Sequence, residues 1–185
     1  MLKIIVATAA ILLPGAALAE DWTKFYAEVY GGAAVGTDTQ YNGADYAMDP
    51  TWAAGAAFGV DFGNGFSLGV DLMKTGDAEY QTWDASVSTF SVMAEGEYAL
   101  ALNDTFSVYG SLGLGAINVA INGMDSDDAW GAGYSAAVGV RADITENLAL
   151  FGEIKHQNTF DTVELFGDDV GAPTNTALVG VRLSF

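Results

Sequence analysis

The last nine residues of the chain constrain its fold more than any other segment. Apolar residues occupy alternate positions, namely Ala177, Val179, Val181, Leu183 and Phe185, and the residues between them include Gly180, Arg182 and Ser184. Because successive side chains of a strand point to opposite faces, this period of two predicts a strand with one apolar and one polar face. Soluble proteins rarely end within a strand on a phenylalanine, so we expect a sheet that is not typical of soluble proteins.

The first 19 residues have the pattern of a secretory signal peptide. Lys3 gives a short basic start, residues 4–13 form an apolar run, and Ala17-Leu18-Ala19 is a small-residue cleavage site. The apolar run is shorter than the roughly 18 residues of a membrane-spanning helix, and no other segment approaches that length. We therefore expect residues 1–19 to be removed and residues 20–185 to form one domain.

The mature chain is strongly acidic and has no cysteine. It keeps all 24 acidic residues and, without Lys3, five of the six basic ones. Nucleic acid is excluded as a partner, because phosphate binding needs a basic patch. The lack of cysteine in an exported chain excludes a disulfide scaffold, thiolate metal sites and cysteine catalysis.

Alternation of apolar residues recurs in eight segments, which cover residues 24–35, 51–62, 66–75, 86–100, 105–117, 130–142, 148–158 and 175–185. Each segment is long enough for a tilted membrane strand, which needs about 9–11 residues. Short turns at 63–65, 101–104 and 143–147 alternate with long loops at 36–50, 76–85, 118–129 and 159–174. This asymmetry is typical of bacterial outer-membrane barrels, whose periplasmic turns are short and whose outer loops are long.

The alternation assigns one face of each strand to lipid. The side chains on this face carry no charge, as a position in the bilayer requires. Aromatic residues gather at two levels: Trp52 and Trp130 near the outer rim, and Phe25, Phe62, Phe66, Tyr98, Phe106 and Phe185 near the periplasmic rim. Two aromatic belts fit the two membrane interfaces. The alternative is a soluble sandwich with the same residues in its core.

The opposite face of the strands is predicted to be polar. An eight-stranded barrel is just wide enough for side chains to fill it, so charges inside must pair. We predict an interior ion-pair network of Glu28, Asp71, Glu95, Glu97, Arg141, Glu153, Lys155 and Arg182. On barrel closure the last strand lies between the first and the seventh, so we expect Arg182 to contact Glu28 or Glu153. The favoured interpretation is a packed interior that keeps the barrel rigid, and a proton or ion path is the alternative.

The loops and the single histidine are the remaining candidates for chemistry. Residues 124–128 could offer oxygen atoms to Ca²⁺, but they lack the glycine and glutamate positions of an EF-hand loop. Solvated acidic loops are the favoured interpretation, with divalent cations as possible ligands. His156 is followed two residues later by Asn158, which cannot be a nucleophile. We predict no catalytic, cofactor-binding or metal-binding residues.

The mature chain resembles the small eight-stranded outer-membrane proteins of Gram-negative bacteria, which include OmpA-like transmembrane domains, OmpX-like barrels and opacity-type barrels. The resemblance rests on Ala17-Leu18-Ala19, the eight alternating segments and residues 179–185. It implies an all-β fold, an eight-stranded antiparallel up-and-down barrel in the cell outer membrane. It also implies that Val181, Leu183 and Phe185 form the signal read by the barrel-assembly machinery.

The resemblance further implies a structural or surface-interaction role, such as envelope integrity, adhesion or recognition through the acidic outer loops. The expected partners are outer-membrane lipids and lipopolysaccharide, and the expected state is a monomer. A narrow channel for ions or small solutes is the first alternative. A lipid A-modifying outer-membrane enzyme is the second.

Overall fold

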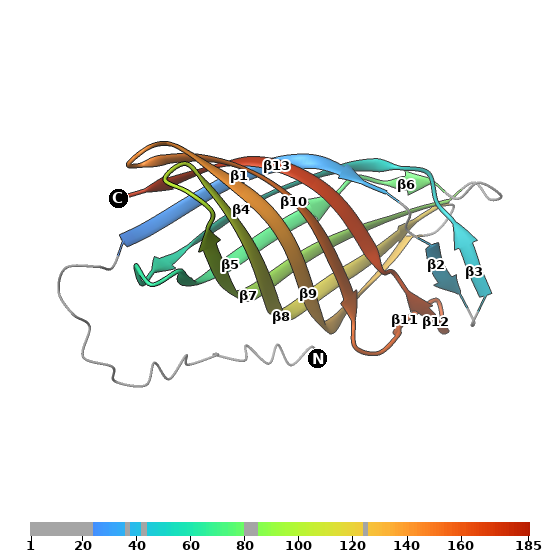
Figure 1. The fold of residues 1–185 in the computed structure, drawn as a ribbon. Coiled ribbons are helices and arrows are strands. Elements are labelled where there is room, and N and C mark those ends of the chain that lie inside the picture. Colours follow the sequence, from blue (N-terminus) through green and yellow to red (C-terminus); the bar gives the residue numbers. More distant parts are fainter. Residues whose placement is uncertain (1–23, 36–37, 42–43, 80–84, 124–125) are drawn as a thin grey trace, which may run out of the picture.

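The computed structural model describes residues 24–35, 38–41, 44–79, 85–123 and 126–185, so the predicted signal peptide lies outside the described residues. Eight long strands dominate the described part (Figure 1): β1 (Lys24–Ala34), β4 (Thr51–Asp61), β5 (Phe66–Thr75), β7 (Ser86–Ala101), β8 (Phe106–Asn122), β9 (Ser126–Thr145), β10 (Leu148–Thr159) and β13 (Thr174–Ser184). Within the described ranges, no helix is long and apolar enough to cross a membrane.

These eight strands form a closed antiparallel barrel, as the sequence predicts. Each strand pairs with its neighbours in chain order, and β1 closes the ring against β13, from Tyr26 opposite Ser184 to Ala34 opposite Thr176. Phe25 and Phe185 extend the closure by exchanging backbone hydrogen bonds of 3.0 and 2.9 Å. The start of β1 and the C-terminus lie at one end with the short turns, which is the periplasmic end in barrels of this kind (Figure 1).

The predicted loop at 118–129 is wrong, because the hairpin of β8 and β9 continues until Asn122 pairs with Ser126. Apolar alternation persists in this part of β8 but changes phase. Leu112 and Leu114 point outward, whereas Ile117, Val119 and Ile121 are buried inside the barrel. The expectation of a polar inner face therefore fails at the outer end of the barrel.

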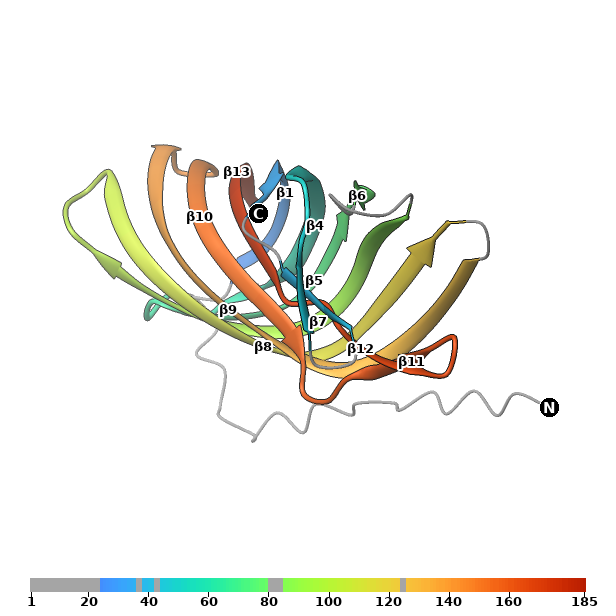
Figure 2. The ribbon, with the colours of Figure 1, turned by 90° about the vertical axis from the view of Figure 1, so that its right-hand side faces the viewer.

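The other three outer loops contain short strands that the sequence analysis did not predict. β11 (Val163–Leu165), β12 (Asp168–Gly171), β2 (Asp38–Tyr41) and β3 (Ala44–Ala47) form a second, four-stranded sheet, and β6 (Ala78–Glu79) pairs with β7. Figures 1 and 2 show the second sheet at the outer end of the barrel. Buried apolar side chains of β6, β11, β12 and the barrel wall form one cluster there, which includes Met93, Ile117, Val119, Leu165 and Val170.

The outward face of the barrel is apolar, as predicted. Its side chains are well exposed, for example Val29, Leu112, Val138 and Val179, which are 59–72% accessible. The expectation that this face carries no charge is wrong at Lys74, a cation near the outer end of β5 that the sequence assignment left out. The inward positions between the apolar ones hold the buried polar residues.

Glycines on the inner wall make room for aromatic rings in the narrow interior. A Cβ atom added at Gly55 would overlap the Tyr30 ring, and one added at Gly139 would overlap the Tyr109 ring. Phe151 lies against Gly180 in the same way. Each of these glycines is directly paired with the aromatic residue on the neighbouring strand, so the inward ring lies over a position that has no side chain.

Candidate functional site

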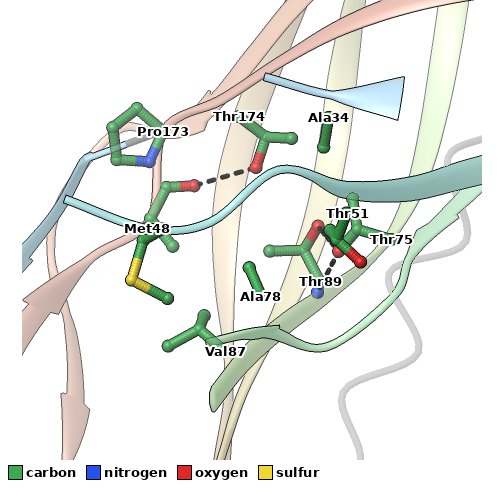
Figure 3. A pocket seen from close by; sticks show the side chains of 10 residues that line it. Ala34, Met48, Thr51, Thr75, Ala78, Val87, Thr89, Pro173 and Thr174 are labelled. Atoms are coloured by element: carbon green, nitrogen blue, oxygen red, sulfur yellow. Dashed lines mark hydrogen bonds between the residues drawn. The ribbon is translucent and has the colours of Figure 1, made fainter. Parts of the chain in front are cut away.

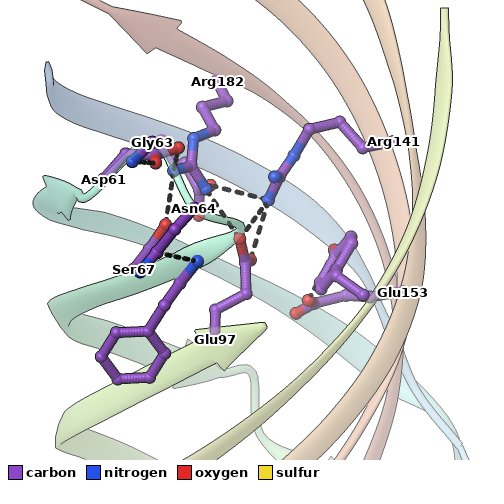
Figure 4. A network of polar contacts seen from close by, with 11 residues as sticks. Asp61, Gly63, Asn64, Ser67, Glu97, Arg141, Glu153 and Arg182 are labelled. Atoms are coloured by element: carbon purple, nitrogen blue, oxygen red, sulfur yellow. Dashed lines mark hydrogen bonds and ion pairs between the residues drawn. The ribbon is translucent and has the colours of Figure 1, made fainter. Parts of the chain in front are cut away.

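The candidate site is the charged interior of the barrel, and Arg182 of β13 is its best-connected residue (Figure 4). Its Nη1 donates to Glu28 at 3.2 Å and to Glu97 at 3.1 Å, while its Nη2 donates to Asp61 at 3.3 Å and to Ser67 at 3.2 Å. Only 2% of the Arg182 side chain is accessible. One buried guanidinium therefore joins residues from β1, β4, β5 and β7.

Arg141 of β9 completes this first cluster. Its Nη2 lies 2.8 Å from both oxygens of Glu97 and 4.0 Å from Glu28. Both guanidinium groups also lie over aromatic rings, Arg141 at 4.8 Å from the Tyr109 centroid and Arg182 at 3.7 Å from the Tyr26 centroid. Such cation–π contacts favour a cation that has lost its water.

A second cluster surrounds Lys155 of β10. The ammonium nitrogen lies 3.3 Å from Asp71, 3.2 Å from Glu95 and 3.6 Å from Glu153, and 2% of the side chain is accessible. The three carboxylates come from β5, β7 and β10. The ammonium therefore ties together three strands around the interior.

Tyrosine hydroxyls hold two of these carboxylates from the other side. Tyr30 donates to Asp71, and Tyr109 donates to Glu153 at 2.9 Å. The ring of Phe151 meets both tyrosines edge-on, with centroids 6.3 and 6.5 Å apart. This aromatic group fills the interior beside the ion pairs.

The structure places all eight residues of the predicted network inside the barrel. Arg182 contacts Glu28, whereas Glu153 pairs with Lys155. Asp61 also belongs to the network and was not in the predicted set, although its inward position was readable from the alternation. Three cations thus face six carboxylates, so each cation is shared by several acidic groups.

A small pocket opens at the outer end, beside the apolar cluster (Figure 3). It encloses about 300 Å³ including its open mouth, and its lining carries no charged residue: Ala34, Met48, Thr51, Thr75, Ala78, Val87, Thr89, Ala172, Pro173 and Thr174. The Thr89 backbone N–H donates to Thr75 Oγ1 at 2.8 Å. No residue of the two charged clusters therefore lines this pocket.

His156 lies on the outward face of β10. Its Nδ1 is 2.8 Å from Asn175 Oδ1, and its ring is 5.9 Å from the Tyr134 ring. Its cross-strand partners are Ala136 and Asn175, neither of which is a nucleophile.

The acidic segment considered for Ca²⁺ is only partly described, because Met124 and Asp125 lie outside the described residues. Asp127 accepts a hydrogen bond from the Phe166 N–H at 2.9 Å, and Asp128 accepts one from Asn118 at 2.8 Å. Neighbouring strand residues point to opposite faces, so these two carboxylates do not converge. Among the described residues, no three acidic or histidine side chains are grouped to hold a metal ion.

Comparison with known proteins gives one family. The family described as outer membrane protein beta-barrel domain matches residues 5–185. No curated protein matches the chain.

Solved structures share the fold at low sequence identity. Neisserial surface protein A is 14% identical, with a TM-score of 0.68 over 87% of this chain and 97% of that one. The N-terminal barrel domain of Pseudomonas aeruginosa OprF is 17% identical, with a TM-score of 0.54 over 86% and 97%. The attachment invasion locus protein Ail of Yersinia pestis is 16% identical, with a TM-score of 0.53 over 86% and 99%.

The geometry predicts that Arg182→Met lowers the free energy of unfolding by about 3–5 kcal/mol, because it leaves buried carboxylates without their cation. Urea unfolding in lipid vesicles, followed by tryptophan fluorescence, measures the change. Lys24→Met is the control, since Lys24 is exposed at the start of β1. Equal stability of the two variants would show that the network does not stabilise the barrel.

Proposed function

Because this chain belongs to the outer membrane protein β-barrel domain family, we propose that it works in the Gram-negative outer membrane as a closed barrel. Its outer end serves surface recognition or envelope structure. The barrel itself provides a rigid support and no passage. The packed interior is the observation that carries this proposal.

Two layers fill the interior. In the first, Arg141, Lys155 and Arg182 are each at most 7% accessible and are held by carboxylates from several strands. In the second, Leu165 of β11 and Val170 of β12 are fully buried in the apolar cluster at the outer end of the barrel. An ion crossing the barrel would have to displace paired charges and then enter an apolar layer, where an unpaired charge is costly.

The exposed part of the outer end is acidic. Asp77, Glu79, Asp161, Glu164 and Asp169 are all exposed there. Apart from Lys74, the basic residues of the mature chain lie in the interior or at the periplasmic end. The Ail structure contains the heparin analogue sucrose octasulfate, a polyanion. Because the outer end of this chain is acidic, charge complementarity favours a basic surface as its partner, or anionic lipopolysaccharide bridged by divalent cations.

A lipid A-modifying enzyme is the less favoured alternative. His156 is bonded to Asn175, and the position two residues after it is Asn158. No serine or threonine stands opposite His156 on either neighbouring strand. We propose a monomer, because closure pairs every barrel strand on both sides and leaves no free barrel edge.

The proposal predicts that the reconstituted protein gives no unitary conductance steps in planar bilayers, because its interior is packed. A boiled and an unboiled sample on an SDS gel check that the tested protein is folded. Reproducible steps from folded protein would favour the channel alternative.

Surface recognition predicts different effects for acidic residues at the two barrel ends. In a strain lacking the native gene, a variant with Asp161→Asn, Glu164→Gln and Asp169→Asn should fail to restore attachment to a basic surface. The matched variant replaces three exposed acidic residues near the periplasmic turns by the corresponding amides, at Asp104, Asp143 and Glu146. It should restore attachment, because the net charge change is the same but the outer end is intact. Equal attachment by both variants, or by the deletion strain, would contradict this role.

We also propose that Val181, Leu183 and Phe185 are the signal for the barrel-assembly machinery. Phe185 stacks on Phe25 with centroids 6.4 Å apart, so both rings lose the same contact when either is removed. Phe185→Ala should lower the amount of folded barrel in the outer membrane more strongly than Phe25→Ala. Quantifying the unboiled band from cells measures this, and equal losses would mean that the ring contact alone matters.

A further inference from the structure

The five basic residues of the mature chain occupy three different environments. Arg141, Lys155 and Arg182 are buried in the interior network, and Lys24 is exposed at the periplasmic start of β1. Lys74 is exposed on the outward face near the outer end of β5. It has no ion-pair or hydrogen-bond partner among the described residues. Its ammonium is therefore available to a partner outside the described residues.

Lys74 begins a row of outward side chains across four neighbouring strands. It pairs with Phe90 of β7, Phe90 pairs with Asn118 of β8, and Asn118 pairs with Trp130 of β9. Directly paired residues lie on the same face of a sheet. The rings of Phe90 and Trp130 meet edge-on at 6.1 Å, and Trp130 is 56% accessible.

A second tryptophan lies on the other side of Lys74. Lys74 pairs with Ala54 of β4, and Trp52 is two residues further along the same face, a diagonal neighbour of the lysine. Trp52 is 54% accessible. Lys74 of β5 thus lies between two exposed indole rings, Trp52 on the neighbouring β4 and Trp130 three strands away on β9.

The row lies where the apolar band of the barrel ends. On the periplasmic side of it the outward residues are aliphatic, such as Leu72 and Leu114. At the row itself Asn118 Nδ2 donates to Asp128 Oδ2 at 2.8 Å, so polar groups begin. Tryptophan and snorkelling lysine are the residues that mark a membrane interface. The ammonium of Lys74 is therefore at headgroup level in the outer leaflet.

We propose that Lys74, Trp52, Phe90 and Trp130 bind the phosphorylated sugar headgroup of an outer-leaflet glycolipid. The ammonium pairs with the phosphate, and the indole rings cover the adjoining sugar and the first carbons of the acyl chains. This lipid site depends on the outer-membrane location of the barrel and is independent of any recognition by its acidic end. Failure of either proposal leaves the other intact.

The test uses the full mature barrel in nanodiscs and lipid A as the probe, with native mass spectrometry and tryptophan emission as two readouts. Wild-type protein should bind lipid A that carries its phosphates and shift its tryptophan emission. Lys74→Gln should bind about fivefold more weakly, the effect of about 1 kcal/mol for one basic residue at an anionic lipid surface. Lys74→Arg should keep the affinity.

The controls separate phosphate, lipid and general charge. Lys24→Gln removes the same charge at the periplasmic end and should leave binding unchanged. The wild-type protein should bind enzymatically dephosphorylated lipid A as weakly as the Lys74→Gln variant binds phosphorylated lipid A. Three results would each overturn the proposed site. They are unchanged lipid A binding by Lys74→Gln, equal binding of dephosphorylated and phosphorylated lipid A by the wild type, and full competition by millimolar inorganic phosphate. Unaltered heat-dependent gel mobility confirms that each variant is folded.

Discussion

The burial of three cations among six carboxylates is the constraint on which the rest of this barrel depends. A charge in a narrow interior is tolerated only with close partners, and no single strand supplies them. Arg182 needs β1, β4 and β7, and Lys155 needs β5, β7 and β10 itself. These contacts exist together only when all the strands are in register around a closed ring. We therefore infer that the ion pairs help to specify the closed barrel as well as to stabilise it.

Packing around the network follows from the same lack of space. Large inward rings such as Tyr30 and Tyr109 require glycine at the directly paired position of the neighbouring strand, Gly55 and Gly139. Their hydroxyls then reach Asp71 and Glu153, so one set of aromatic residues fills volume and satisfies carboxylates. In the proposed function, an interior built in this way acts as the support, and the outer surfaces of the barrel make the functional contacts.

The sequence alone predicts most of the barrel because the contrast between a lipid face and an interior face is constant along most of its strands. The prediction from the sequence fails at Ile117, Val119 and Ile121, where the strand continues but the apolar residues point inward. Alternation also cannot reveal β2, β3, β11 and β12, because three or four residues are too few to show a period. Neighbouring strands place Arg182 beside Glu28, but the contact of Arg182 with Glu97 crosses the barrel from β13 to β7. Contacts across the interior depend on barrel diameter and strand stagger, which no local pattern encodes.

The apolar cluster at the outer end also separates two sets of charges. Inside, Lys155 and the arginines pair with carboxylates whose positions the fold cannot change without loss of stability. Outside, the exposed carboxylates around β6, β11 and β12 lie beyond Leu165 and Val170 and belong to short strands and turns. Because a layer without charge lies between them, substitutions on the outer surface leave the interior pairs untouched. If the outer end recognises a partner as proposed, its surface charge can vary with that partner while the interior network keeps the support constant.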